Sequence, residues 1–451
     1  MSAAEPYRPT LHFSPRTGWI NDPNGLIFVD GIWHAFYQYH PFSTVWGPMH
    51  WGHASSPDLV TWTEHPVALA PDALGTCFSG SAIEAPDGSI KLFYTAHSTG
   101  PDGSDHQVQC LAHADCSLTV FDRDDHNPIL PNPGLTVFRD PKVFRHEESG
   151  RWIMVVTHGQ SIGIYASDDL VDWRFESAFG EGHGRHSDGP WECPDLFPMT
   201  APDGRRCWVL LVGIGGGAYA AGSGTQYFIG SFDGHEFVNA NPPSVELWLD
   251  HGRDFYAAQS FFGSPGDAPI VLAWASNWLY ARHTPTTAFR GALTLPRQLR
   301  LVGSGDSLRL AACVPDAVVA VFDHFDLADA PIVPRTGTYR LSGTVRLSRE
   351  GSATLALFGE APQFELRRSV AGDTTLRVRR PAVDGMPHFA HDYTIELGEI
   401  REVEIDVYVD NGIVELSLSG GRVWVSNLHF PARPAGQIQL EHFERSEFRF
   451  A

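Results

Sequence analysis

Cysteine is scarce in this sequence, and its spacing is irregular. The six cysteines among 451 residues are Cys77, Cys110, Cys116, Cys193, Cys207 and Cys313. So low a density excludes a disulfide-stapled scaffold, and we expect free thiols. The segment HQVQCLAHADC interleaves two of these cysteines with His106 and His113, but it lacks the CxxC pairing of zinc sites and predicts a strand with its turn. His183 and His186 are likewise expected to be structural.

Basic residues are also few, and no apolar run is long. The sequence has 32 lysines and arginines against 53 acidic residues, a net charge of -21, without a basic cluster. Nucleic acid and anionic membranes are therefore poor partners. No apolar run reaches the roughly 18 residues of a spanning helix, and MSAAEPYRPT lacks the basic start and apolar stretch of a secretory signal. We expect a cytoplasmic protein, or a secreted one if a leader precedes this sequence.

Helical periodicity is nearly absent. Short apolar or alternating runs recur instead, among them LIFVDGIWHAFYQY, IKLFYTA, RWIMVVTHG and CWVLLVGI, and 44 glycines and 33 prolines separate them. Such runs between turn residues predict strands, so we expect an all-β chain. Because 451 residues exceed the size at which one core usually stops growing, we expect two domains.

One strand-turn segment occurs twice. SSPDLVTWTE, around Trp62, returns 111 residues later as ASDDLVDWRF, around Trp173, and GSFDGHEF is a weaker echo. This interval equals two steps of about 55 residues, close to the length of a four-stranded propeller blade. The repeat predicts a β-propeller in which the same turn joins the outer strands of successive blades.

Polar residues follow the same period. The segments NDPNG, CFSGSA, FRDPKVF, WECPDLF and RDFYAAQSF carry Asp22, Ser79, Asp140, Glu192 and Tyr256 at intervals of 52 to 64 residues. If each segment is the innermost strand of its blade, five blades bring three carboxylates to one end of the central channel. On spacing alone two interpretations stay open: a catalytic site, or a cluster that binds a metal such as calcium.

Paired carboxylates are typical of glycosyl transfer. In retaining hydrolysis an ionised carboxylate attacks the anomeric carbon, while a protonated partner about 5 Å away donates to the leaving oxygen. Asp22 and Glu192 can fill these roles, and Asp140 would hold the sugar and favour its positively charged transition state. Arg139 would keep nearby carboxylates ionised, whereas crowding by two anions beside Trp191 suits Glu192 to proton donation. This scheme needs carboxylates and water, so we expect no cofactor and no metal.

Five stretches, which cover much of residues 11–200, carry a resemblance to a known family. They are LHFSPRTGWINDPNGLIF, HAFYQYHPFSTVWGPMHWGHASSPDLVTW, FSGSA, RDPKVF and WECPDLF. They resemble glycoside hydrolase family 32, the β-fructofuranosidases that include invertases, levanases and exo-inulinases. The resemblance implies a five-bladed β-propeller followed by a C-terminal β-sandwich. It also implies that Asp22 is the nucleophile, Asp140 the transition-state stabiliser and Glu192 the general acid/base. Positions that match the surroundings of the terminal fructosyl unit are Asn21, Gln38, Trp46, Phe78, Ser79 and Arg139.

The expected pocket suits a compact sugar. The polar groups of Asn21, Gln38 and Arg139 can bind ring hydroxyls, while Trp46 and Phe78 can cover an apolar face. The resemblance places Trp278 at the rim, where its ring would stack on a sugar. Most of the 13 tryptophans are expected in the core. Successive strand residues face opposite sides, so Cys193 should face away from Glu192. It is expected to be a packing residue, or one that supports the residues of the site, and not a nucleophile.

Further stretches bear on the substrate. WVLLVGIGGGAYAAGSGTQYFIGSFDG, WLDHGRDFYAAQSF and SNWLYARHTPTTAFRGALTLPRQL resemble levanases and exo-inulinases more than sucrose-dedicated invertases. They imply a retaining exohydrolase that releases terminal fructosyl units from fructans, fructo-oligosaccharides and sucrose. The missing leader and Ala275, where a larger apolar residue is common, depart from that pattern. A sucrose-dedicated invertase and a fructosyltransferase with the same carboxylates remain alternatives, as does a non-catalytic sugar-binding propeller, although such a propeller usually lacks one acid. The GIGGGAYAAG segment is expected to be a loop between strands, because no helix follows it.

The pattern changes beyond residue 304. Alternating segments such as TYRLSGTVRLS, TTLRVRR and REVEIDVYVDNGIVELSLSGG predict strands of two sheets packed face to face, with a hairpin turn at VDNGI. We therefore expect a propeller domain over residues 1–304 and a β-sandwich over residues 305–451. The oligomeric state does not follow from the sequence.

Overall fold

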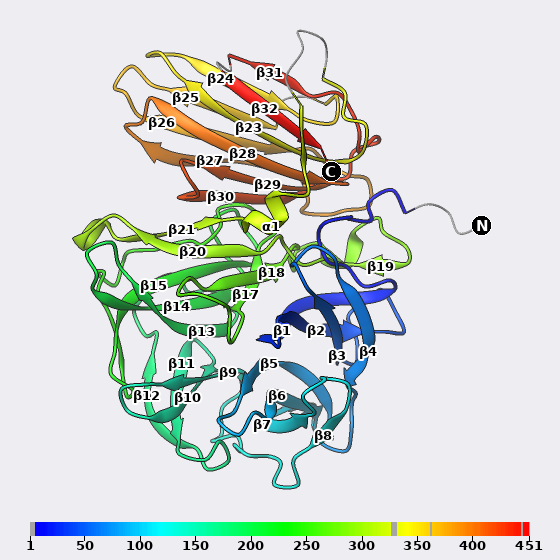
Figure 1. The fold of residues 1–451 in the computed structure, drawn as a ribbon, viewed down its shortest axis with the longest axis vertical. Coiled ribbons are helices and arrows are strands. Elements are labelled where there is room, and N and C mark those ends of the chain that lie inside the picture. The colour runs from blue at the N-terminus through cyan, green and yellow to red at the C-terminus, as the bar shows by residue number, and fades with distance from the viewer. Residues whose placement is uncertain (1–4, 326–331, 361–362, 443–444, 451) are drawn as a thin grey trace.

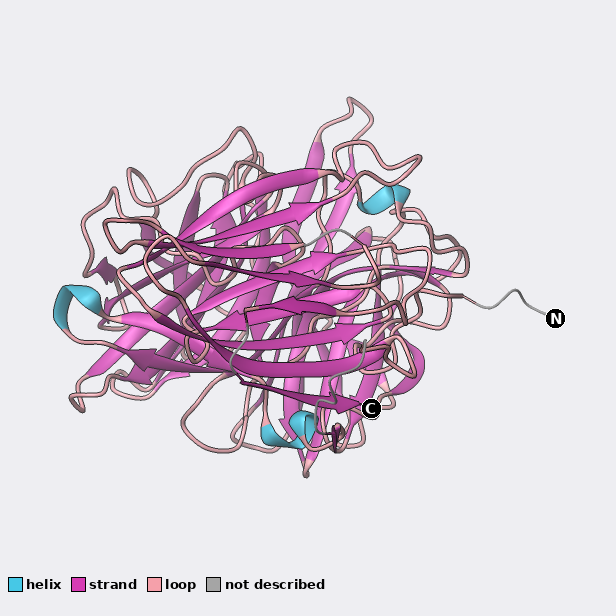
Figure 2. Ribbon diagram, turned by 90° about the horizontal axis from the view of Figure 1, so that it is seen from above, coloured by secondary structure: helices cyan, strands magenta, loops and turns pink. Residues whose placement is uncertain are grey.

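The computed structural model describes residues 5–325, 332–360, 363–442 and 445–450. Strands dominate this part of the chain, and helical structure is limited to α1 (Asp316–Val319) and two 3₁₀ turns (Figure 2). The predicted all-β class is confirmed. All six cysteines are unpaired, as expected. A helix long and apolar enough to cross a membrane is absent from the described residues.

Five sheets make up the first part of the molecule. Their strand orders are β1-β2-β3-β4 with β19 beside β1, β5-β6-β7-β8, β9-β10-β11-β12, β13-β14-β15-β16 and β17-β18-β20-β21. The bounds are β1 (Gly18–Val29), β2 (Ile32–His40), β3 (His50–Ser56), β4 (Thr63–Leu69), β5 (Thr76–Glu84), β6 (Ile90–Thr99), β7 (Asp105–Ala114), β8 (Phe121–Arg123), β9 (Phe138–His146), β10 (Arg151–His158), β11 (Ser161–Ser167), β12 (Arg174–Phe179), β13 (Trp191–Thr200), β14 (Arg206–Ile214), β15 (Gly224–Phe232), β16 (Phe237–Asn239), β17 (Tyr256–Ser260), β18 (Ile270–Trp274), β19 (Phe289–Arg290), β20 (Arg297–Val302) and β21 (Arg309–Cys313).

The first strands of these sheets lie around a common centre (Figure 1). β1 contacts β5, β5 contacts β9, β9 contacts β13, β13 contacts β17, and β17 contacts β1 again. These five strands carry the five periodic segments, so the prediction that each segment forms the first strand of its own sheet is confirmed. The parallel pairing of β19 with β1 joins the chain that leaves β18 to the first sheet.

The repeated segment forms the same turn in the first and third sheets. Leu59 and Leu170 both have left-handed backbones, with φ of 65° and 71°. In each turn an aspartate carboxylate, from Asp58 or Asp169, accepts two backbone N–H bonds of 2.6 to 3.0 Å. Each turn joins the third and fourth strands of its sheet, as the repeat predicts. Aspartate is suited to this place because its short side chain can bond the backbone two residues on.

Two further sheets form the second part of the molecule, in the orders β22-β32-β23-β28-β29-β30 and β27-β26-β25-β24-β31. Apolar side chains from both sheets pack into one core, as the alternating segments predict. The hairpin turn predicted at VDNGI connects β28 with β29. The bounds are β22 (Asp323–Phe325), β23 (Thr338–Arg346), β24 (Ser352–Ala356), β25 (Phe364–Arg368), β26 (Thr374–Arg380), β27 (His391–Gly398), β28 (Glu402–Asp410), β29 (Ile413–Leu418), β30 (Val423–Leu428), β31 (Gln439–Glu441) and β32 (Arg445–Phe450).

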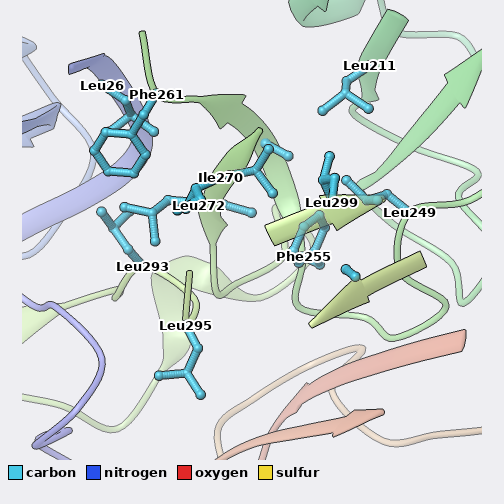
Figure 3. Packing of buried hydrophobic residues seen from close by; sticks show 14 of the residues in the cluster. Leu26, Leu211, Leu249, Phe255, Phe261, Ile270, Leu272, Leu293, Leu295 and Leu299 are labelled. Carbon is cyan, nitrogen blue, oxygen red and sulfur yellow. The ribbon is translucent and has the colours of Figure 1, made fainter. Parts of the chain in front are cut away.

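The largest apolar core reaches across the junction between the two parts. Figure 3 shows Leu26 and Phe261 close together, and Leu299 near Leu249 and Phe255. Tyr408 and Trp424 of the second part belong to the same core. The burial of this apolar surface holds the two parts together.

Buried charges cross the same junction. The Arg297 guanidinium donates to Asp250 Oδ2 at 2.8 Å and to Glu415 Oε2 at 2.6 Å, and all three side chains are fully buried. His12 lies between Asp410 Oδ2, at 2.9 Å from Nδ1, and Glu415 Oε1, at 3.0 Å from Nε2. Burial lowers the pKa of His12, but hydrogen bonds to Asp410 and Glu415 outweigh this effect and raise the pKa to about 9. The protonated imidazole thus joins the N-terminal segment to β28 and β29.

The His12 contacts predict a pH-dependent stability. Because the folded-state pKa of His12 lies above the ordinary value of 6.5, the stabilisation is complete below pH 6.5 and is lost as the pH rises through about 9. His12→Gln should cost about 3–5 kcal/mol at pH 6, the usual result of removing one partner from a buried charge network, and should flatten this pH dependence. Thermal unfolding at pH 6 and pH 9 measures both effects. His126→Gln, at a side chain that is 75% exposed, is the matched control; equal behaviour of the two variants would refute the assignment.

Candidate active site

One cavity of about 490 Å³ collects every residue that the sequence nominated for the site. It is lined by Asn21, Asp22, Gln38, Trp46, Phe78, Ser79, Arg139, Asp140, Glu192 and Trp278. The five additional lining residues are His97, Thr99, Asp105, Gln107 and Arg282. The cavity lies where the first strands of the five sheets meet, so three carboxyl groups from three different sheets face one space.

A break in strand pairing accompanies each functional segment. The registers shift between Ile20 and Pro23, Phe78 and Gly80, Glu192 and Asp195, and Tyr256 and Gln259, and the β9–β10 register shifts opposite Asp140. Such bulges bend a strand and re-aim its side chains. In the second sheet the bulge requires glycine, because a Cβ on Gly80 would lie 1.9 Å from the Phe93 carbonyl oxygen. The bulges thus turn a regular repeat into a convergent set of side chains.

Asp22 is buried at the base of the cavity. Its Oδ2 atom accepts a 2.6 Å hydrogen bond from Ser79 Oγ and lies 3.5 Å from Cys193 Sγ. Its Oδ1 atom has no hydrogen-bond partner among the described residues. Burial raises the pKa of Asp22, the Ser79 hydrogen bond opposes that shift, and the negative charge of Glu192 adds to it. One carboxylate oxygen is thus held in place while the other keeps its lone pairs free.

Asp140 and Cys193 form a second buried pair. Both have left-handed backbones, with φ of 64° and 48°. Asp140 Oδ2 accepts a 2.9 Å hydrogen bond from the Cys193 backbone N–H and lies 3.6 Å from its thiol. Burial raises the pKa of Asp140 to about 7, since repulsion by Glu192 and Asp22 adds to burial and Arg139 offsets only part of the shift.

The side chain of Cys193 does not point where strand alternation alone would direct it, although it does support the acids of the site. Strand alternation would turn its side chain away from the acids, but the bulge brings the thiol against the carboxylates of Asp22 and Asp140. Burial and the adjacent carboxylates raise the pKa of this thiol well above its ordinary value. The thiol therefore packs against the acids in its protonated form.

Glu192 is the most accessible of the three acids, with 20% of its side chain exposed. Its Oε1 atom accepts hydrogen bonds from Arg139 Nη2 at 2.7 Å and Nε at 3.2 Å, and its Oε2 atom accepts one from the Tyr256 hydroxyl. Burial lowers the pKa of Arg139, but attraction to Glu192 and Asp140 outweighs this effect and raises the pKa above its ordinary value. The guanidinium therefore stays charged. The cation that we expected to act on the neighbouring acids is thus bonded directly to Glu192.

Buried polar contacts hold the acid-bearing strands in place from below. Lys142 of β9 donates from Nζ to Asp195 Oδ2 of β13 at 3.1 Å and to the Ser260 carbonyl oxygen of β17 at 2.7 Å. On the other side, the Asp140 backbone N–H donates to Thr95 Oγ1 at 3.0 Å. Strands from four sheets are therefore tied together directly behind the carboxyl groups.

Aromatic rings form the upper wall of the cavity. Trp46 is 36% exposed and meets Phe78 edge to face, with ring centroids 6.2 Å apart. Phe78 in turn stacks on His97 at 4.2 Å. On another side, Trp278 stacks on the buried ring of Trp19 at 6.0 Å. Rings with one supported and one open face are suited to stacking on sugars.

The polar shell behind this wall is held by short bonds. Asn21 Oδ1 accepts a hydrogen bond from Trp19 Nε1 at 2.8 Å, and Gln38 Nε2 donates to the Cys77 carbonyl oxygen at 2.9 Å. Both side chains thereby keep one amide atom for other partners. The predicted sugar-binding polar groups therefore have defined orientations.

Sequence reasoning missed the five additional lining residues. Four of them stand opposite one another on β6 and β7, where His97 pairs with Gln107 and Thr99 with Asp105. They come from the second and third strands of a sheet, whereas the periodic motif marks first strands only. The usable signal was the polar ends of the two strands that flank residues 100–104, in the same sheet as Ser79.

Other patterns in the sequence are structural. The glycine-rich segment 215–223 connects β14 with β15, as predicted. The segment with alternating cysteine and histidine forms β7 and the turn after it, also as predicted. Within the described ranges, no three His, Cys, Asp or Glu side chains are grouped in a way that could hold a metal ion.

Comparisons with known proteins agree with this geometry. A sequence model of the glycosyl hydrolases family 32 N-terminal domain matches residues 12–311. Levanase of Bacillus subtilis (strain 168) is 45% identical over 317 residues, which cover 68% of this chain and 46% of levanase. The extracellular exo-inulinase inuE of Aspergillus niger is 39% identical over 337 residues, which cover 66% of this chain and 62% of the inulinase. The chain thus spans less than two thirds of either relative.

Solved structures extend the likeness to the whole chain. The crystal structure of exo-inulinase from Aspergillus awamori has a TM-score of 0.87 and 29% identity, with 100% of this chain and 99% of that chain covered. The β-fructofuranosidase of Schwanniomyces occidentalis, complexed with fructosyl-erythritol, has a TM-score of 0.84 and 28% identity, with 100% and 98% covered. These neighbours combine a β-propeller with a β-sandwich, and the present chain shares that fold. The chain belongs to glycosyl hydrolase family 32.

Proposed function

We propose that this protein is a retaining glycoside hydrolase that releases terminal non-reducing β-D-fructofuranosyl units from fructans, fructo-oligosaccharides and sucrose. The observation that carries the proposal is the convergence of Asp22, Asp140 and Glu192 in one cavity, each from the first strand of a different sheet. Two carboxyl groups in unlike surroundings suit a double displacement, because one must attack while the other carries a proton.

Asp22 is the proposed nucleophile. Its buried carboxylate would lie beneath the sugar, and its unpartnered Oδ1 atom is the one that would bond to the anomeric carbon. The Ser79 hydrogen bond to Oδ2 supports the ionised form that attack requires. Asp140, beside it, would accept hydrogen bonds from sugar hydroxyls and stabilise positive charge on the ring.

Glu192 is the proposed general acid and base. Its greater exposure suits a group that must reach the leaving oxygen on the open side of the cavity and later meet a water molecule. The pair formed by Arg139 and Tyr256 holds both of its oxygens in position. The aromatic side chains of Trp46, Phe78 and Trp278 would cover the sugar and exclude water during the first step.

The substrate class rests on the family and on the site. The relatives named above are a levanase and an exo-inulinase, and one structural relative was complexed with fructosyl-erythritol. A cavity of about 490 Å³ lined by three acids and several aromatic rings is large enough for a terminal sugar unit. The exo mode of action is part of the proposal, and the levanase and exo-inulinase relatives support it.

We also propose that the five sheets are the blades of a five-bladed propeller, because their first strands contact one another in a closed cycle. The sequence pattern places the domain boundary at residue 304. The pairing of β21 with β20 favours a boundary after Cys313 instead, since it keeps both strands in one sheet.

Product analysis tests the proposed function. We expect sucrose, short inulin oligomers and levan to release free fructose one unit at a time, measured by chromatography over the time course. Mixed oligomers would indicate endo cleavage, and longer products would indicate transfer to another sugar. Either pattern as the main result would contradict exo-hydrolysis.

Glu192→Gln tests the acid role. Loss of the proton donor should lower kcat on sucrose by about 10²–10⁴-fold. The first step should be nearly normal on an aryl β-fructofuranoside whose leaving group needs no proton, which a pre-steady-state burst would report. Glu402→Gln, at a side chain 52% exposed in the sandwich, is the control. Equal losses on both substrates would contradict the assignment.

Asp140→Asn tests the electrostatic strain at the site. Since the pKa of Asp140 is raised to about 7, its ionisation costs stability as the pH rises from about 4 to 7. The variant should therefore unfold at a higher temperature than the parent at pH 8, with the difference shrinking toward pH 4, while kcat falls on the order of 10²–10³-fold. Asp203→Asn, at a side chain 52% exposed, should change neither. A variant destabilised equally at both pH values would disprove this account.

A further inference from the structure

A second cavity, of about 550 Å³, lies in the sandwich and shares no lining residue with the catalytic cavity. It is bounded by the end of β26, the segment that follows it, the start of β27 and the segment after β30, together with Glu360 and Gln363. Arg380 in its wall also donates to Asp254 Oδ2 at 2.7 Å, and Asp254 lies two residues before β17 begins. The cavity therefore borders the junction with the propeller.

The cavity wall combines apolar surface with charged groups of both signs. Phe430, Val383 and Pro381 supply apolar surface. Arg379 is 40% exposed, its Nη2 atom lies 3.6 Å from Glu365 Oε2, and it stands opposite Asp392 in the strand pairing. Glu360 and Asp392 also line the cavity. A wall of this kind offers hydrogen-bond donors and acceptors beside an apolar face.

Several nitrogens in this wall have no hydrogen-bond partner. Arg379 Nε, Arg380 Nη2 and His429 Nε2 are buried and unpartnered among the described residues. Arg380 and His429 are each 2% exposed. A buried polar atom without a partner costs free energy, so these groups gain if a small shift of the wall brings them against a ligand oxygen.

The mixture of groups selects the class of ligand. An anion would face Glu360 and Asp392 in a protein of net charge -21, and a cation would face two guanidinium groups. A neutral polyol meets both signs, because each hydroxyl donates and accepts one hydrogen bond, and its C–H face can cover Phe430. We propose that this cavity is a second, non-catalytic binding site for a short fructosyl oligosaccharide. The choice of sugar rests on the proposed function.

Counting bound sugar tests the second site. In the full-length Asp22→Asn variant, which should not turn the sugar over, equilibrium dialysis with labelled 1-kestose should give two molecules per chain. Adding Arg379→Met, or separately Glu360→Gln, should reduce this to one. Arg367→Met, on the neighbouring strand β25 and 69% exposed, should leave two. Thermal unfolding checks that each variant is folded.

Activity gives an independent readout. Arg379→Met in the otherwise unchanged protein should keep kcat/KM on sucrose within about twofold, because the cavity is separate from the acids. In the dialysis experiment, one bound 1-kestose per chain in the Asp22→Asn variant would overturn the proposal. Two bound molecules in both the Arg379→Met and the Glu360→Gln derivatives would overturn it as well. The protein with Asp22 intact could release no fructose, while Arg379→Met or Glu360→Gln in the Asp22→Asn background still reduces the bound sugar from two molecules to one. That result would support the second site and contradict the proposed function.

Discussion

Three carboxyl groups in one cavity, two of them buried, impose the constraint on which the rest of the site depends. Their mutual repulsion and burial raise the pKa values of Asp22 and Asp140, so the cluster binds protons that isolated acids would lose. The fold tolerates this cost through Arg139 on Glu192, Ser79 on Asp22 and the Cys193 backbone on Asp140. Arg139 and Tyr256 bond to Glu192, so the acid proposed to donate the proton has surroundings unlike those of the two buried acids.

The motifs around the acids are explained by their neighbours as much as by the acids. In DPK and ECPD, Lys142 and Asp195 form a buried ion pair behind the cavity and hold β9 against β13. The residues after the acids adopt bulged backbones that no regular strand would give, and this geometry turns carboxyl groups from separate sheets toward one point. The same short segments therefore both position the acids and hold the strands together.

Sequence reasoning predicted what periodicity and motifs encode. The five first strands, the repeated turn at Asp58 and Asp169, and all ten nominated residues were within its reach, because each recurs at blade spacing or lies in a long matching stretch. The left-handed backbone of Cys193 could not be predicted, because a cysteine at this position does not by itself indicate a bulge. Strand alternation then gave the wrong direction for its side chain. His97 and Asp105 were missed because they reach the cavity through the pairing of β6 with β7, which the spacing of the motifs does not report. The bond between His12 and Asp410 joins residues almost 400 positions apart, which no local pattern reports.

The most direct test of the account is to trap the sugar on the protein. An activated fructoside given to Glu192→Gln should form a covalent intermediate quickly and release it slowly, because the variant lacks the base that activates water. Mass spectrometry of the quenched, digested protein should then place one fructosyl unit on the peptide that contains Asp22. A fructosyl unit on Asp140 or Cys193, or product formation with no adduct under conditions of slow release, would contradict the assignment.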